Sequence, residues 1–305
     1  MTNLRQRHIM DTEVMAGEFS SNQGGEHSLE KSIGDIIRET NNLSAEQVEN
    51  ILTYQRENNV KFGEAAVALG LANQDEVLWA LAQQFHYPYA NQTSARLSDE
   101  LVVANKPFCD QSEIFRGIRG HLSSTVFNGA ERNLALAVIS AESGDGKTFF
   151  AANMAVALSQ LGGRTLLIDA DMRAPRLHEV FKVGSKGGLS GILSGRAGGN
   201  ALCKVAGLPS LYVLPVGIVP PNPLELLQRQ AFGLLLQELT KKFDHVIVDT
   251  PSASSGIDAR VIAASCGAVL AIARKDKTRA DALHLLLGPL NRGATKLVGV
   301  VMNER

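Results

Sequence analysis

A glycine-rich segment, SGDGKT, carries the residue types that bind phosphate groups. Gly144 and Gly146 allow the backbone to point its N–H groups at phosphate oxygens. Lys147 supplies a mobile positive charge, and the Thr148 hydroxyl suits the coordination shell of Mg²⁺. A helix-forming stretch follows, so its positive end would face the anion. We therefore expect this segment, Asp145 included, to bind a nucleotide.

The start of the segment departs from the usual phosphate-loop pattern. Ala141 stands where such loops normally begin with glycine, so the letters alone also fit an ordinary surface turn. The apolar run before the segment and the helical pattern after it favour the phosphate loop.

Two carboxylates follow a second apolar run, TLLIDADMR. Asp169 and Asp171 can point into one crevice, where one can hold Mg²⁺ through water and the other can accept a proton or orient a hydroxyl. In a simpler alternative, Asp171 only caps the next helix and Asp169 only accepts local backbone N–H groups. The residues by themselves leave both roles open.

A third apolar run, HVIVDT, ends in Asp249. This is the expected place for a carboxylate that holds Mg²⁺ through water. A strand that ends in Asp is common, so Asp249 alone says little. Together and in this order, the three segments predict a magnesium–nucleotide site.

The elements around these segments alternate between strand and helix patterns from residue 112 to residue 305. The strand patterns are nearly continuous apolar runs, as in parallel sheets that are covered on both faces. Such sheets bind ligands at the carboxyl ends of their strands, where all three segments fall. We predict an α/β P-loop NTPase with a mainly parallel sheet, preceded by a small all-α module.

That module is expected at residues 29–92, where a helical pattern repeats at an offset of 29 residues. Gly34 corresponds to Gly63, for example. Each half opens a helix with a capping box, Ser44 with Gln47 and Asn73 with Glu76. Residues 1–28 are predicted to be a disordered tail, and residues 93–111 a linker with one short helix near residues 98–104.

Composition limits the class of protein. The formal net charge of −1 over 305 residues gives no reason to expect a nucleic-acid partner. No apolar run is long enough to span a bilayer and no signal-peptide pattern opens the chain, so we expect a cytoplasmic protein. Cys109, Cys203 and Cys266 are far apart and without ligand spacing, which predicts reduced structural thiols.

With these three motifs, residues 112–305 resemble the bacterial tyrosine kinases that pair with membrane chain-length regulators in exopolysaccharide export. The stretches GLSGIL and LPVGIVPPNPLELL agree with the same family. The resemblance implies an ATP-dependent protein-tyrosine kinase in which Lys147 contacts the transferring phosphate and Asp169 prepares the tyrosine hydroxyl.

The same resemblance implies ATP and Mg²⁺ as cofactors. Thr148 and Asp249 would bind Mg²⁺, with Asp171 assisting. Asn303, near the end of the predicted last strand, matches the position that reads adenine in related ATPases, although it also fits a plain turn.

Glu113, Arg116 and Arg119 follow at steps of three, which places them on one face of a helix. In the resembled family, this pattern joins subunits into a ring; an ion pair within one helix is the simpler alternative. Gly117 and Gly120 weaken the helix, which suggests that it becomes firm only on assembly.

The resembled family usually ends in a tyrosine-rich tail, whereas the last tyrosine here is Tyr212. Tyr87 and Tyr89, near the linker, are candidate acceptors that are also suited to packing against the helical module. Since no membrane segment is fused to this domain, the resemblance implies a separate membrane partner that recruits the protein.

The helical module resembles the N-terminal domain of type II secretion and pilus ATPases. Some of those domains bind cyclic di-GMP through Arg-Leu-Gly turns, which here read SIG and KFG, with Lys61 the charge that remains. We expect protein docking, with nucleotide sensing as the alternative.

Two other functions stay open for the larger domain. One is a membrane-positioning or partition ATPase, which would carry a lysine where this chain has Glu142. The other is a nucleotide-dependent regulator of polysaccharide export that transfers nothing to tyrosine.

Overall fold

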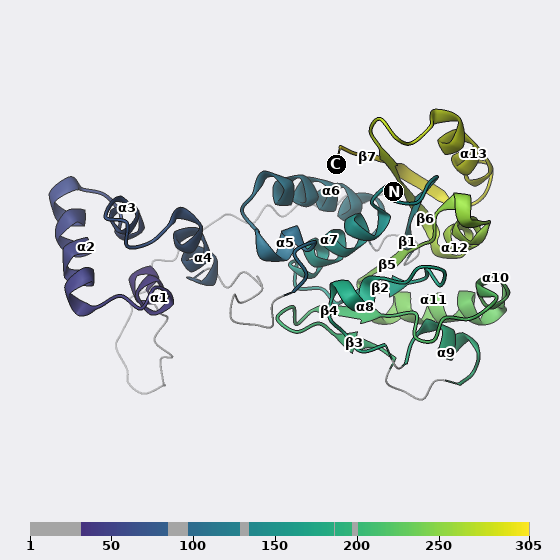
Figure 1. Ribbon diagram of the computed structural model, residues 1–305, viewed down its shortest axis with the longest axis horizontal. Helices are drawn as coiled ribbons and strands as arrows, with labels where there is room; N and C mark the ends of the chain where they lie inside the picture. Colours follow the sequence, from purple (N-terminus) through teal and green to yellow (C-terminus); the bar gives the residue numbers. More distant parts are fainter. Residues whose placement is uncertain (1–31, 85–96, 129–133, 186, 197–200, 305) are drawn as a thin grey trace, which may run out of the picture.

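The computed structural model describes residues 32–84, 97–128, 134–185, 187–196 and 201–304. Figure 1 shows a group of N-terminal helices followed by an α/β domain. The predicted tail at residues 1–28, and Tyr87 and Tyr89, lie outside the described residues. Within the described ranges, no helix is both apolar enough and long enough to cross a bilayer.

The N-terminal helices follow the predicted repeat. They are α1 (Ile33–Thr40), α2 (Ala45–Asn58), α3 (Phe62–Ala68) and α4 (Gln74–Gln84). The starts of α3 and α4 lie 29 residues after those of α1 and α2, as expected. Both predicted capping boxes are present: Gln47 N–H donates to Ser44 Oγ at 3.2 Å, and Glu76 N–H to Asn73 Oδ1 at 2.9 Å.

The two halves of the repeat pack across each other, α1 against α4 and α2 against α3. Their shared core is small and contains Ile51, Ala65 and Ala66. Gly63 is buried in α3, and a Cβ atom there would lie 2.5 Å from Val77 Cγ1. The equivalent Gly34 has ordinary space, because its Cβ would lie 3.7 Å from the nearest atom. The two halves of the repeat therefore have similar helices, but their equivalent glycines are packed to different degrees.

A seven-stranded sheet forms the centre of the α/β domain, in the order β3-β4-β2-β5-β1-β6-β7. Its strands are β1 (Ala135–Ser140), β2 (Thr165–Asp169), β3 (Cys203–Lys204), β4 (Leu211–Leu214), β5 (His245–Asp249), β6 (Gly267–Arg274) and β7 (Lys296–Asn303). All strand pairs are parallel except β3 with β4. The mainly parallel sheet is confirmed, and the short antiparallel β3 was not foreseen.

Helices cover both faces of the sheet, as predicted (Figure 1). Leu136 and Val138 of β1 face one core, and Ala137 and Ile139 face the other. The first core is covered by α5 (Val102–Asn105), α6 (Asp110–Thr125), α7 (Lys147–Ser159) and α8 (Leu177–Val180). The second is covered by α9 (Leu189–Leu193), α10 (Pro223–Leu227), α11 (Gln230–Lys242), α12 (Asp258–Cys266) and α13 (Ala280–Asn291). A 3₁₀ turn, η1 (Ala253–Ser255), precedes α12.

Part of the expected linker belongs to this domain. Leu97, Leu101 and Val103 are buried in the first core. The Asn153 side chain of α7 accepts a hydrogen bond from Val103 N–H at 3.0 Å and donates one to Glu100 O at 2.8 Å. The many polar residues of this stretch suggested a linker, but its few apolar side chains pack into the core. The α/β domain therefore includes residues from Leu97 onward.

The helix α6 corrects a second expectation. It runs without a break through Gly117 and Gly120 in a single chain. Phe115 and Leu122 are buried on its inner face, while the two glycines have open space around them. Packing against α7 therefore outweighs the weak propensity of two glycines, and assembly is not needed to form the helix.

The unequal packing of the repeat predicts unequal effects of adding one methyl group. Gly63→Ala should destabilise the helical module by about 1–3 kcal/mol, because its Cβ collides with Val77. Gly34→Ala, its counterpart in the other half, should be neutral or slightly stabilising. Amide hydrogen exchange of α2 and α3 in the full chain measures this difference. Equal protection in the two variants would contradict it.

Candidate nucleotide-binding site

The predicted phosphate loop joins β1 to α7. Gly144 and Gly146 have φ values of +79° and +102°, which favour glycine. Gly146 is the N-cap of α7 and offers no side chain to the first turn. Lys147 is buried, and its Nζ donates to Ser140 Oγ at 3.0 Å. The loop thus presents a helix N-terminus and a sequestered ammonium group to the same place.

Asp145 closes the start of the loop. Its Oδ2 accepts the Glu142 N–H at 3.0 Å. Its Oδ1 is buried and has no hydrogen-bond partner within the described residues. Asp145 therefore shapes the loop from inside.

Asp169 and Asp249 lie side by side, because they are register partners at the ends of β2 and β5. Both side chains are buried. Thr148 lies close enough to the Asp249 carboxyl to lower its pKa, and Asp249 Oδ1 has no hydrogen-bond partner among the described residues. The parallel register has thus brought the second and third motifs together beside the phosphate loop.

The two carboxylates of the DxD motif both organise backbone. Asp169 Oδ1 accepts Asp171 N–H at 3.2 Å, and its Oδ2 accepts Leu177 N–H at 3.1 Å at the start of α8. Asp171 Oδ1 accepts the N–H groups of Arg173 and Ala174 at 3.1 and 3.0 Å. Both side chains accept backbone N–H groups, as in the simpler alternative, but Asp169 and not Asp171 is the one that reaches the start of the next helix. These hydrogen bonds fix the carboxylates next to the loop without excluding chemistry there.

Burial shifts the protonation of this group. It raises the pKa of Asp249 to about 7, with the Asp171 charge adding to the rise while Thr148 and Lys147 oppose it. Burial and the Asp249 charge hold the pKa of Asp169 well above its ordinary value. Burial lowers the pKa of Lys147, although Asp249, Asp171 and Asp145 act in the opposite direction. A divalent cation would relieve the crowded carboxylates.

The residues fit Mg²⁺ bound together with a nucleotide better than they fit a protein-only metal cage. Within the described chain, no cluster of three or more His, Cys, Asp or Glu side chains could hold a metal ion. The unpartnered Oδ1 of Asp249 and the neighbouring Thr148 offer oxygen ligands of the kind that Mg²⁺ shares with phosphates and water.

Three residues at the site were not found from the sequence. Ser140 holds Lys147, and Arg274 and Lys277 donate to carbonyl groups of the phosphate loop. The sequence-predicted Asn303 is also at the loop, where its Nδ2 donates to Asp145 O at 3.0 Å. Ser140 could have been noticed as the last strand residue before the loop. The two basic residues lie about 130 positions away, with no local signal.

An ion pair between an exposed arginine and a buried carboxylate connects the second and third motifs. The Arg173 guanidinium donates to both oxygens of Asp258 at 3.2 and 3.1 Å, and Asp258 is only 1% exposed. Asp258 begins α12, after the segment that follows Asp249. Arg173, the last residue of the DADMR motif, thus links the two strand ends.

A family model of known nucleotide-binding domains, described as the CobQ/CobB/MinD/ParA nucleotide binding domain, matches residues 136–304. Tyrosine-protein kinase CpsD of Streptococcus agalactiae is 34% identical over 194 residues, which are 63% of this chain and 82% of that protein. The chain belongs to the bacterial tyrosine-kinase family.

Solved structures agree with this assignment. The kinase domain of the Escherichia coli tyrosine kinase ETK matches with a TM-score of 0.62 and 31% identity, covering 67% of this chain and 79% of that one. The chimerical protein CapA2B2 matches with a TM-score of 0.63 and 30% identity, covering 74% and 97%. These relatives favour the kinase over the partition-type ATPase that was considered from the sequence.

The predicted oligomerisation residues of this tyrosine-kinase chain lie along α6. Arg116 pairs with Glu113 and also donates to Pro107 O. Arg119 donates to Ala157 O at 2.8 Å, near the end of α7. In the single chain these arginines fasten α6 to its own domain, and Ile114 is 62% exposed on the same helix.

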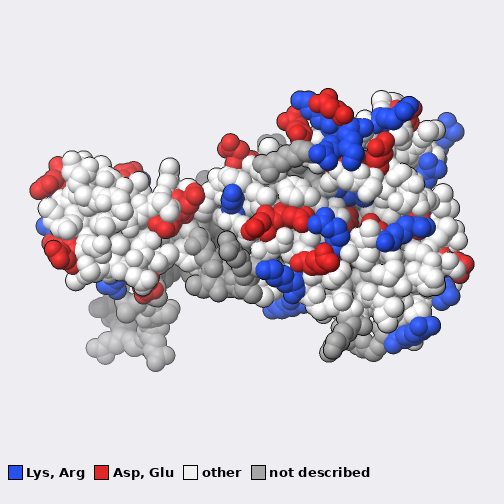
Figure 2. Space-filling model, viewed as in Figure 1, with Lys and Arg blue, Asp and Glu red and all other residues white. Residues whose placement is uncertain are grey.

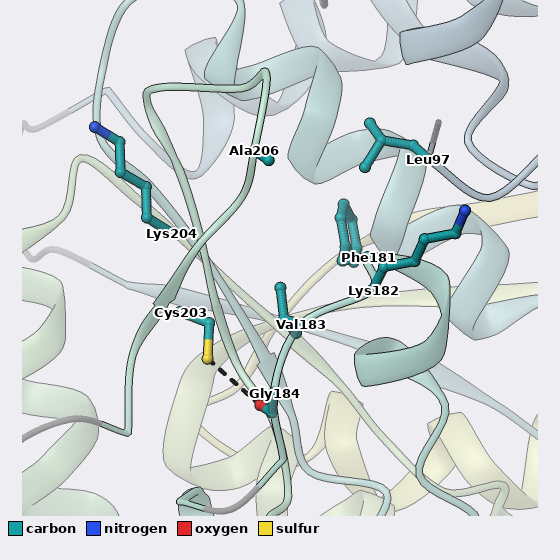
Figure 3. Close-up of a pocket in the computed structure, with 8 residues that line it drawn as sticks. All are labelled: Leu97, Phe181, Lys182, Val183, Gly184, Cys203, Lys204 and Ala206. Atoms are coloured by element: carbon teal, nitrogen blue, oxygen red, sulfur yellow. Dashed lines mark hydrogen bonds between the residues drawn. The ribbon is translucent and has the colours of Figure 1, made fainter. Parts of the chain in front are cut away.

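The cysteines of the kinase are free thiols, as expected. Cys203 lines a small pocket with Phe181 and Lys182, and its Sγ donates to Gly184 O at 3.5 Å (Figure 3). Burial raises the pKa of the Cys266 thiol. None of these thiols belongs to the nucleotide-binding site.

The raised pKa of Asp249 predicts a pH-dependent effect of Asp249→Asn on stability without nucleotide. A carboxyl whose pKa rises on folding stabilises the protein below the unfolded value and loses this contribution as pH rises through about 7. The variant lacks that loss. Its unfolding free energy should exceed that of the wild type by less than about 2 kcal/mol at pH 5 and by about 4 kcal/mol at pH 8.

Denaturant unfolding at the two pH values measures this difference. Saturating Mg²⁺ and ADP should reverse it, because they stabilise the wild type more than Asp249→Asn. A difference in unfolding free energy that is the same at pH 5 and pH 8 would contradict the assignment of this carboxyl.

Proposed function

We propose that this kinase transfers the γ-phosphate of ATP to tyrosine hydroxyls and thereby regulates exopolysaccharide polymerisation, chain length and export. The observation that carries the proposal is the buried Lys147 beside the paired ends of β2 and β5, where Asp169 and Asp249 meet. A phosphate loop alone would serve any nucleotide-binding protein. The additional carboxylates supply what a hydroxyl acceptor needs.

The roles follow from position. Lys147 and the first turn of α7 would bind the phosphates, and Thr148, Asp171 and Asp249 would lie at Mg²⁺. Asp169 would receive the tyrosine proton as the bond from the tyrosine oxygen to phosphorus forms and the bond to ADP breaks. Burial raises the pKa of Asp169, and a more basic carboxylate is a stronger proton acceptor. Asn303 would lie at the adenine side of the loop.

The acceptor tyrosine is best sought on another chain or in residues 85–96. Tyr54 and Tyr212 are half-buried, and the Tyr212 ring packs on Phe243 with centroids 5.4 Å apart. This packing holds the Tyr212 side chain away from a phosphate bound in its own domain. Tyr87 and Tyr89 are therefore our candidate acceptors within this sequence.

The partner that fits this function is a membrane-embedded chain-length regulator, whose cytoplasmic segment would recruit the kinase to the inner face of the membrane. We further propose that α6, with Glu113, Arg116 and Arg119, joins subunits into a ring. Ile114 is a large apolar side chain that is exposed on this helix, which supports a surface that a second subunit covers.

For the helical module, protein docking is the function that we propose. An acidic residue directly follows each segment that replaces the Arg-Leu-Gly motif, in the first turn of a helix: Asp35 accepts from Ser32, and Glu64 accepts from the Lys61 N–H. Carboxylates at these places disfavour an anionic ligand such as a cyclic dinucleotide.

Phosphotyrosine formation tests the main proposal. The pure protein is incubated with Mg²⁺ and ATP, alone and with the cytoplasmic segment of its membrane partner. The wild type should gain phosphotyrosine, whereas Lys147→Met and Asp169→Asn should lose at least about 100-fold in rate. Silence of the wild type in both mixtures, with ATP binding intact, would instead identify a regulator that does not transfer phosphate.

A charge placed on the outer surface of α6 tests the ring. Ile114→Glu should reduce the assembled mass measured by light scattering, because a carboxylate would be buried at the interface. Leu285→Glu is the matched control, since Leu285 is 70% exposed on α13. Loss of assembly in both variants, or in neither, would count against α6 as the interface.

A further inference from the structure

Three consecutive carbonyl groups of the phosphate loop are each held from outside by a side chain. Ser143 O accepts from Lys277 Nζ at 2.9 Å, and Gly144 O accepts from Arg274 at 3.2 Å. The third, Asp145 O, accepts from Asn303. We propose that these donors form a carbonyl clamp, in which Lys277 and Arg274 are positioning residues that set the nucleotide affinity of the loop without touching the nucleotide. This inference rests on the proposed nucleotide site.

The clamp has a direct geometric consequence. A peptide unit points its C=O and N–H in opposite directions, so a loop whose carbonyls are tied outward turns its N–H groups inward, toward the phosphates. The positive φ values favour glycine at positions 144 and 146. Small residues there also leave room for the donors. A Cβ on Gly144 would lie 2.9 Å from the movable end of Lys277, and one on Gly146 would collide with Asn303 Nδ2.

The donors stand on a braced turn between β6 and α13. Arg274 N–H donates to Thr278 Oγ1 at 2.7 Å, and Thr278 N–H returns to Arg274 O at 2.9 Å. Lys275 N–H donates to Asn303 O at 2.9 Å, which joins the turn to the end of β7. The backbone that carries the clamp is therefore anchored on two neighbouring strands.

Charge gives the clamp a second effect. The Lys277 ammonium is close enough to Lys147 to help lower the pKa of that buried lysine. Figure 2 shows basic side chains gathered over the region where Figure 1 places β7 and α13, with acidic ones beside them. The phosphate site is thus flanked by ammonium groups inside and outside the loop.

Calorimetric titration of the full chain with Mg²⁺ and ADP tests the clamp. Lys277→Met and Arg274→Met should each raise Kd roughly tenfold, the scale of one charge-assisted hydrogen bond. Lys277→Arg should restore most of the affinity, because it keeps a donor of similar reach. In phosphorylation assays, KM for ATP should rise while kcat stays within about twofold, since the loop shape serves ground and transition states alike.

Lys275→Met is the matched control. Lys275 lies in the same turn and carries the same charge, but its ammonium faces Glu304 at 3.8 Å. Its Kd should stay within about twofold of the wild type. Equal weakening by Lys275→Met and Lys277→Met would reduce the effect to general electrostatics and overturn the clamp, as would an unchanged Kd in Lys277→Met.

The outcome separates this inference from the proposed kinase activity. If the protein binds nucleotide in a Lys277-dependent way but forms no phosphotyrosine, the clamp is supported. In that case only the kinase proposal is overturned. A wild type that binds no nucleotide overturns both.

Discussion

Two carboxyl groups are buried side by side where β2 and β5 end, and the site depends on how their charge is compensated. Asp169 and Asp249 are neighbours because the parallel register pairs them. Desolvation disfavours their ionised forms, and Lys147, itself desolvated, offers only partial relief. Without a ligand, this group of buried charges destabilises the folded protein. A bound cation with a polyphosphate would compensate the charges, so the electrostatic cost of the empty site would become part of the binding free energy.

The elements around the carboxylates serve this arrangement. The apolar strands are buried on both faces, so water reaches the site only from the ends of the strands. Arg173 and Asp258 hold the segments that follow β2 and β5 together. The loop of Gly144 and Gly146 closes the remaining side. Rigidity of this kind favours electrostatic positioning, on which phosphoryl transfer depends.

Much of this could be read from local sequence. Buried parallel strands are continuous apolar runs, so the strand that leads to the phosphate loop and the strands that end at Asp169 and Asp249 were predictable, as was their meeting at one edge. The capping boxes of Ser44 and Asn73 are equally local, and they placed the helices of the repeat correctly. In each case the determining residues lie within a few positions of one another.

What escaped prediction depends on distant partners. The anchoring of Leu97 and Leu101 requires a core formed by later residues, and α6 tolerates Gly117 and Gly120 because of α7. The backbone contacts of Asp169 and Asp171 were foreseen only as one of two alternatives, because the conformation of the following turn decides them. No local pattern marks Arg274 and Lys277 as donors to a loop far away in the chain.

The hydrogen bond from Asn303 to Asp145 O spans 158 residues, most of the α/β domain. A contact of this separation cannot form during synthesis until both of its partners have been made. The glycine-rich loop is translated midway through the chain, yet its backing arrives with the final strand at the sheet edge. The loop therefore lacks this hydrogen bond until β7 has been synthesised, so the growing chain carries a phosphate loop without its full support.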